Sequence, residues 1–136
     1  DVDGTTVYRH SQSKDPSLGG LGAMKVEYTK NGLAWSYMGA HLSNSNPLRD
    51  FSKHTRLVIP VYGQATILVK LRDRAMREVD IATQTAGNSN GWSHLVFDYS
   101  NVTAIDLSDI DNIMVFVAPG NTTASGTIYL DDLTLE

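Results

Sequence analysis

The chain has 136 residues, a formal net charge of −4 and no cysteine. This length fits one domain, residues 1–136, because two halves would each fall near the lower size limit of independent folding. The acidic charge argues against nucleic acid or an anionic membrane as the main partner, and the missing cysteines exclude disulfides and thiolate metal sites. The densest basic segment, residues 70–77, is interrupted by Asp73 and is expected to be a solvated hairpin end.

Strand signals dominate the chain, and no stretch sustains the apolar repeat of an amphipathic helix over three turns. Apolar and polar residues alternate with period two, which places one kind of residue on each face of a strand. The segments with this pattern are residues 23–29, 56–62, 66–72, 77–83 and 93–99. Residues 112–118, NIMVFVA, are apolar at both parities, which indicates a central strand covered on both faces. Turn-rich pieces such as YGQA and AGNSNG separate the strands, so the pattern predicts an all-β sandwich or barrel.

In the last ten residues, TIYLDDLTLE, the alternation of apolar and polar residues shifts by one position within one predicted strand. Ile128 and Leu130 have one parity and the two leucines that follow have the other, so the register must slip at Asp131 and Asp132. A carboxylate turned toward the core is costly unless it is paired or binds a cation, and Ca²⁺ accepts irregular sets of oxygen ligands. The simpler interpretation is a solvated polar pair near a strand end.

The N-terminal segments offer more oxygen ligands for such a cation. DVDG, residues 1–4, contributes two carboxylates, and DPSLGGLG, residues 15–22, is a glycine-rich loop whose carbonyls can turn toward an ion. First and last strands commonly lie side by side in a sandwich, so a bound ion would join them.

Five segments, in this order along the chain, carry a resemblance to a known group of domains. They read DVDG, GGLGAMKVEYT, GWSHLVFDYS, DLSDIDNIMVFVAP and IYLDDLTLE. Together they resemble the calcium-bearing carbohydrate-binding modules of the jelly-roll type, the group that includes families 4, 11 and 22. The resemblance implies a β-sandwich (jelly roll) of two antiparallel sheets that binds a polysaccharide or oligosaccharide. It also implies a structural calcium ion, with Asp131, Asp3 and a carbonyl near Gly20 among its ligands.

A glycan presents apolar C–H faces and a rim of hydroxyls, so its sites combine aromatic rings with charged and amide side chains. Outward positions of the predicted strands form a row with this mixture: Arg56, Tyr62, Lys70, Arg72, Glu78, Asp80, Gln84, Trp92 and His94. Trp92 begins a strand, and its alternative role is to plug the end of the sandwich. Trp35 and Tyr37 share a face two residues apart and form a rival platform, unless they pack in the core.

Two other classes of function compete with glycan binding. A small jelly-roll glycoside hydrolase needs two carboxylates across a cleft, and Glu78 and Asp80 are neighbours on one strand face between short turns. A protein-binding adhesion sandwich would expose an apolar patch, and the sequence shows none clearly. We therefore expect a non-catalytic module, and the resemblance implies that its ligand is a glycan such as a β-glucan, xylan or mannan. Because the chain begins with Asp1, we expect it to be a processed or excised piece of a longer chain. The resemblance implies that this parent chain is a secreted, extracellular polysaccharide-degrading enzyme whose catalytic domain lies elsewhere in it.

Overall fold

A computed structural model describes residues 6–13, 16, 18, 22–30, 38–42, 49–117 and 125–136. The strands are β1 (Thr6–Ser13), β2 (Ala23–Lys30), β3 (Met38–His41), β4 (Arg56–Asp73), β5 (Glu78–Asp98), β6 (Ile110–Val117), β7 (Ser125–Leu130) and β8 (Thr134–Leu135). A short 3-10 helix, η2 (Phe51–Lys53), precedes β4. The all-β prediction is confirmed. Among the described residues, no helix has the length and apolar character needed to cross a membrane.

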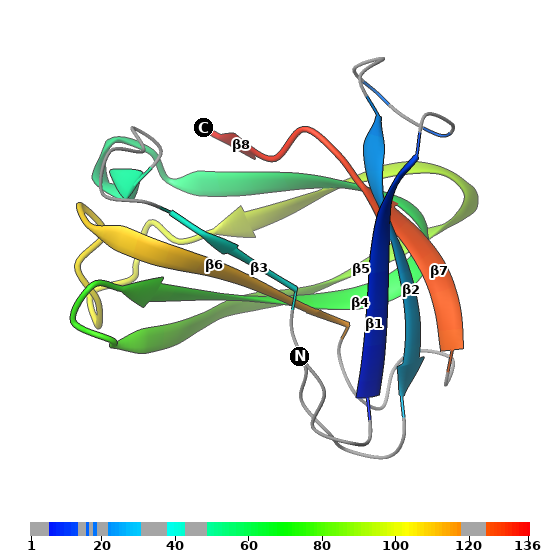
Figure 1. The fold of residues 1–136 in the computed structure, drawn as a ribbon. Helices are drawn as coiled ribbons and strands as arrows, with labels where there is room; N and C mark the ends of the chain where they lie inside the picture. Colours follow the sequence, from blue (N-terminus) through cyan, green and yellow to red (C-terminus); the bar gives the residue numbers. More distant parts are fainter. Residues whose placement is uncertain are drawn as a thin grey trace.

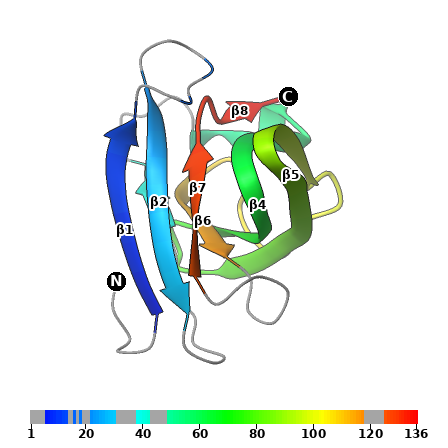
Figure 2. The ribbon, with the colours of Figure 1, turned by 90° about the vertical axis from the view of Figure 1, so that its right-hand side faces the viewer.

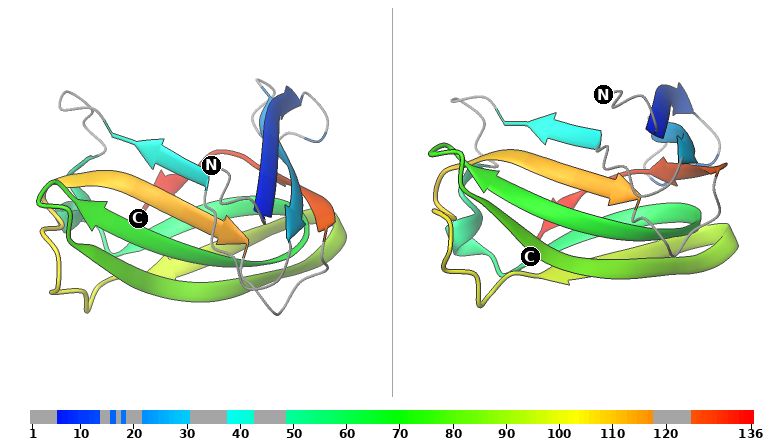
Figure 3. Two further views of the ribbon diagram at one scale, coloured as in Figure 1. Left: turned by 60° about the horizontal axis from the view of Figure 1, so that its bottom comes forward. Right: turned by 90° about the horizontal axis from the view of Figure 1, so that it is seen from below.

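The strands pair antiparallel in the order β1-β2-β7-β4-β6-β3. β5 runs along the other edge of β4, and β8 pairs with the first residues of β4. Figure 1 shows that the long β4–β5 ribbon folds back on itself, so its two halves lie in the two layers of a sandwich. The first layer places β1, β2, β7, β4 and β5 side by side (Figure 2), and the second places β3, β6, β4 and β5 side by side (Figure 3).

The sequence predicts that turns at YGQA and AGNSNG separate strands, and this prediction is wrong. Both segments stay paired, with Gly63 opposite Asn88 and Gln64 opposite Gly87. Gly63 has a φ of 102°, a conformation that favours glycine, and β5 carries the extra residues 89–91 at this point. The chain therefore bends through these segments as a continuous two-stranded ribbon.

The core lies between the two layers and is supplied mainly by one face of β4. Its inward side chains are almost completely inaccessible to solvent in both halves of the strand: Leu57, Ile59, Val61, Ile67, Val69 and Leu71. Burial of each such side chain stabilises the fold by roughly 1.5–3 kcal/mol. Because the inward parity is unbroken through the bend, the opposite face of β4 points outward from both layers.

β6 is buried on both faces, as its sequence predicts. Ile113, Val115 and Val117 pack into the main core. On the other face, Met114 and Phe116 form a second buried cluster with Leu68 of β4. This second cluster lies on the outer side of the second layer, where Lys70 of β4 stands over the Phe116 ring.

Candidate functional site

Lys70, in the second half of β4, lies between two carboxylates of β5. Its Nζ atom is 3.4 Å from Glu78 Oε2 and 3.4 Å from Asp80 Oδ1. Cross-strand pairing explains the contact with Asp80, because Asp80 lies directly opposite Lys70 and such pairs share one face. The ammonium also stands 5.9 Å from the centre of the Phe116 ring, within the range of a cation–π interaction.

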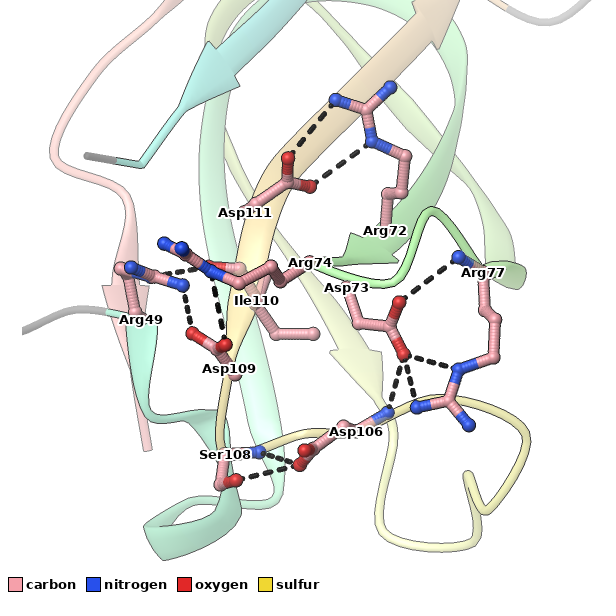
Figure 4. Close-up of polar contacts among 10 residues, drawn as sticks. All are labelled: Arg49, Arg72, Asp73, Arg74, Arg77, Asp106, Ser108, Asp109, Ile110 and Asp111. Atoms are coloured by element: carbon pink, nitrogen blue, oxygen red, sulfur yellow. Dashed lines mark hydrogen bonds and ion pairs between the residues drawn. The ribbon is translucent and has the colours of Figure 1, made fainter. Parts of the chain in front are cut away.

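Arg72 holds a second carboxylate two residues farther along β4. Its Nε is 3.1 Å from Asp111 Oδ1 and its Nη2 is 3.3 Å from Asp111 Oδ2, a two-pronged contact (Figure 4). Asp111 is an extra residue of β6, because its sequence neighbours Asn112 and Ile110 lie opposite the consecutive residues Arg72 and Asp73 of β4. This bulge directs the Asp111 carboxylate toward the Arg72 guanidinium. We call five residues the charged face: Lys70, Arg72, Glu78, Asp80 and Asp111.

Apolar side chains form a floor beneath the charged face. Leu68, Met114 and Phe116 are only 3–7% exposed, so they support the charged side chains and do not form an open platform. Asn112, which pairs with Arg72, is 7% exposed, and its Oδ1 has no hydrogen-bond partner in the described part of the chain. An acceptor of this kind costs about 1–3 kcal/mol while it is unsatisfied, so a hydroxyl donor that reached it would be bound favourably.

Three aromatic side chains gather on the outer side of the first layer. The Tyr62 ring lies 5.6 Å from the Trp92 ring and 5.8 Å from the Tyr129 ring, both in edge-to-face arrangements. Trp92 and Tyr129 are the residues that pair with Tyr62 on its two sides, and all three are half-buried. We call Tyr62, Trp92 and Tyr129 the aromatic row.

The structure divides the predicted glycan-binding row between two surfaces. Lys70, Arg72, Glu78 and Asp80 come together on the second layer, as alternation predicts. Tyr62 and Trp92 lie on the outer side of the first layer, because the ribbon folds back between the two sets of residues.

The structure places the remaining described residues of the predicted glycan-binding row away from the charged face. Gln84 is exposed but lies opposite the core residue Ile67, so its predicted place beside Glu78 and Asp80 is wrong. The reason is a bulge: Lys70 pairs with Asp80 and the preceding residue pairs with Ala82, which reverses the parity of β5 beyond that point.

Arg56 and His94 are both exposed on the first layer. Arg56, at the start of β4, lies opposite Asp98. His94 lies opposite Pro60 and follows Trp92 of the aromatic row by two residues. The rival platform, Trp35 and Tyr37, lies outside the described residues.

The predicted register slip at Asp131 and Asp132 is present. β7 ends at Leu130, Asp132 has a positive φ of 37°, and β8 begins at Thr134. The Asp131 carboxylate accepts hydrogen bonds from Leu18 N at 2.7 Å and from Asp132 N at 3.0 Å. Asp131 therefore contacts Leu18, within the glycine-rich segment 15–22, while Asp132 is exposed.

The two other predicted calcium ligands, Asp3 and Gly20, lie outside the described residues. Within the ranges that the structure describes, no group of three His, Cys, Asp or Glu side chains is placed to hold a metal. Of the three predicted calcium ligands, the structure therefore describes only Asp131, at the end of β7.

Sequence reasoning missed a buried carboxylate at the end of the β4–β5 ribbon. Asp73 continues the inward parity of β4, is buried, and accepts hydrogen bonds from Arg77 Nε at 2.7 Å and Asp106 N at 2.9 Å (Figure 4). Burial alone would raise the pKa of the Asp73 carboxyl, but these bonds outweigh it and hold the pKa below its usual range. The segment is a hairpin end as predicted, but its acidic residue is not solvated.

A neighbouring ion-pair group fastens the same end of the ribbon to the start of β6. Arg49 and Arg74 both pair with Asp109, and Arg49 Nε donates to the carbonyl oxygen of Ile110 at 3.3 Å. The charged face is therefore carried by strands whose ends are tied together.

Solved structures with the same fold include several carbohydrate-binding modules. A family 11 module from Clostridium thermocellum, in complex with a β-1,3-1,4-mixed-linked tetrasaccharide, has a TM-score of 0.64 and 17% identity over 96% of this chain and 82% of that one. A xylan-binding domain of family 22 has a TM-score of 0.57 and 18% identity over 98% and 86%.

A third structure is a lysine-to-alanine variant of a family 29 module complexed with cellulohexaose, with a TM-score of 0.53 and 16% identity over 96% and 91%. No model of a protein family matches the sequence, and no curated protein matches it. At these identities the likeness establishes the fold alone, a β-sandwich.

Proposed function

We propose that this chain is a non-catalytic carbohydrate-binding module that binds a β-linked glycan on the charged face. The observation that carries the proposal is the combination of the fold, shared with glycan-bound modules over nearly the whole chain, and a fixed array of charged groups on one outer layer. The glycan class we propose is a β-glucan, xylan or mannan.

The chemistry of the charged face suits a neutral glycan. The cations Lys70 and Arg72 are already paired with Glu78, Asp80 and Asp111, so the face offers oriented donors and acceptors and no uncompensated positive charge. Sugar hydroxyls can both donate and accept, and hydrogen bonds to charged partners are the stronger kind. A lysine-to-alanine and an arginine-to-alanine variant of the family 29 module were made to probe its mechanism of ligand recognition, which supports a role for such side chains here.

Glycan binding without bond cleavage is the function that this carboxylate arrangement supports. A glycosidase places two carboxyl groups on either side of the bond that it cleaves. Glu78 and Asp80 lie on one strand and both contact the same ammonium of Lys70, so they approach a ligand from one side. We propose that the module concentrates an attached, secreted polysaccharide-degrading enzyme on its substrate, with a catalytic domain elsewhere in the parent chain.

We further propose a structural calcium ion held by Asp131, Asp3 and a carbonyl near Gly20. The hydrogen bond from Leu18 N to Asp131 supports this, because Leu18 precedes Gly20 by only two residues in the chain. Calcium accepts carboxylate and carbonyl oxygens together, and an ion there would stabilise the junction of the loop with the end of β7.

Affinity gel electrophoresis through mixed-linkage β-glucan, xylan and mannan tests the proposed function. We expect retardation by at least one polymer, and no release of reducing ends during hours of incubation with that polymer. Migration unaffected by every polymer would contradict glycan binding, and steady release of reducing ends that Glu78→Gln abolishes would contradict the non-catalytic role.

A further inference from the structure

We propose that the aromatic row is a second glycan-binding site, on the outer side of the layer opposite the charged face. This inference rests on the proposed function, since it assigns another surface to the same class of ligand. The fold-back of the β4–β5 ribbon is its starting point, because it directs the outer side chains of the two halves of β4 away from each other.

The aromatic row belongs to a line of side chains that crosses four strands in register. Lys25 of β2 pairs with Tyr129 of β7, Tyr129 pairs with Tyr62 of β4, and Tyr62 pairs with Trp92 of β5. Directly paired residues share a face, so all four side chains stand on the same surface. At about 4.8 Å between strands, the line spans about 14 Å, enough to contact a short oligosaccharide that lies across the strands.

Local irregularities of the backbone place the rings in this line. The extra residues 89–91 bring Trp92 opposite Tyr62. Neighbouring residues fix the conformation of this segment. Asn88 Oδ1 accepts a hydrogen bond from Asn90 N, and Gly91 has no room for a side chain, because an added Cβ would lie only 2.2 Å from Asn88 Nδ2. Bulges commonly re-aim side chains next to functional sites.

The surroundings of the rings favour a glycan over a protein partner. Lys25 and Glu27 form an ion pair at 3.1 Å beside Tyr129, and the exposed Thr127 and His94 flank the row. Half-buried rings can contact the C–H faces of sugars while these polar groups bind the hydroxyls. A protein interface would need a larger apolar core than these three rings and the exposed Val96 of β5 provide.

The test uses the two tryptophans of the chain as reporters. The Trp92 indole N–H signal is assigned by its loss in Trp92→Phe, and ¹⁵N-labelled protein is titrated with the mixed-linkage tetrasaccharide and with cello-, xylo- and manno-oligosaccharides. We expect the Trp92 signal to shift saturably, both in wild-type protein and in the Lys70→Ala/Arg72→Ala variant. Calorimetric stoichiometry should fall from two to one in that variant.

The rim variant Lys25→Ala/Glu27→Ala tests the same site without removing a ring. It should weaken the Trp92 response several-fold and leave the response of the charged face unchanged. A Trp92 signal that stays fixed while amides of the charged face shift would overturn the second site alone. If no oligosaccharide shifts the signals of either surface, the proposed function is overturned as well.

Discussion

Lys70 is the side chain at which the charged face meets its apolar floor. Its ammonium contacts two carboxylates and stands over the ring of Phe116, while the side chain remains 27% exposed. Partly exposed ion pairs of this kind contribute little to stability. In the proposed function their value is orientation, because they would hold a donor in place for the glycan before it binds.

Replacement of Lys70 or Arg72 by alanine should weaken glycan binding at the charged face by about 10- to 100-fold. This is the range expected when a hydrogen bond to a charged group, about 1.5–3 kcal/mol, is removed. Shifts of the charged-face amides in an NMR titration give the dissociation constant of this site separately from the aromatic row. Lys53→Ala is the matched control, because Lys53 is 76% exposed on η2 and pairs with Asp50, which is not part of the charged face. Equal dissociation constants for all three variants and the wild type would remove glycan binding from the charged face.

Asp131→Ala and Asp132→Ala should differ in their response to calcium. An ion that binds only the folded state at a hundredfold excess over its Kd stabilises it by about 2.7 kcal/mol, which for this length is roughly 3–6 °C in Tm. Chelation should therefore lower the Tm of the wild type and of Asp132→Ala, whose side chain is exposed. Asp131→Ala should melt low with or without added calcium. Identical melts of calcium-loaded wild type with and without chelator would contradict the site.

Alternation in the sequence is enough to predict the side chains of the charged face that lie on regular strand. It fails where one extra residue reverses the parity, which is why Gln84 is misplaced and Asp111 is missed. Asp73 could have been found, because it continues the inward positions of β4 after Leu71. Bulged residues leave no comparable signal in a single sequence.

At the scale of elements, the β4–β5 ribbon decides the architecture. Its bend passes the ribbon from one layer to the other, and its end is fastened to the start of β6 through Asp73, Arg74 and Asp109. Sequence segments rich in Gly, Asn and Ser predict turns at the bend. They cannot distinguish a reversal of one strand from a bend of two paired strands, because both need the same flexible residues.

Gly63→Ala should destabilise the protein, and Gly87→Ala should not. Gly63 has a φ of 102°, and a Cβ there would lie 3.2 Å from the Thr127 carbonyl oxygen, so alanine is strained by about 1–3 kcal/mol. Gly87 lies in the same bend with nothing within 4 Å of an added Cβ. Denaturant unfolding measures both. Equal midpoints for the two variants would show that the bend does not depend on the conformation of Gly63.

The stability of the ribbon end should depend on pH through Asp73. Its pKa in the folded protein is below the ordinary value of 3.8, so the folded state favours the ionised carboxylate. The stabilisation is therefore complete above the unfolded pKa and is lost as pH falls through the folded pKa. Asp73→Asn should melt several degrees lower than wild type at pH 7, with a smaller decrease in Tm between pH 5 and pH 2.5. Calorimetric melting curves that stay parallel over this range would contradict the role of the carboxylate.

At the scale of the whole molecule, the sandwich presents two unlike outer surfaces. The charged face lies on the layer of β3 and β6, and the aromatic row lies on the layer of β1, β2 and β7. Period-two alternation predicts the class of this fold, because each strand buries one face. It does not predict which outward residues share a surface, since that depends on how the ribbon bends between the layers.

Mapping a glycan on the labelled protein tests the central proposal most directly. Titration of ¹⁵N-labelled protein with the oligosaccharide of the polymer that retards it best reports every backbone amide. We predict saturable shifts concentrated in residues 66–72, 78–85 and 111–116, together with loss of those shifts in Lys70→Ala/Arg72→Ala. Saturable binding that leaves these three segments unmoved would contradict the proposal that the charged face holds the glycan.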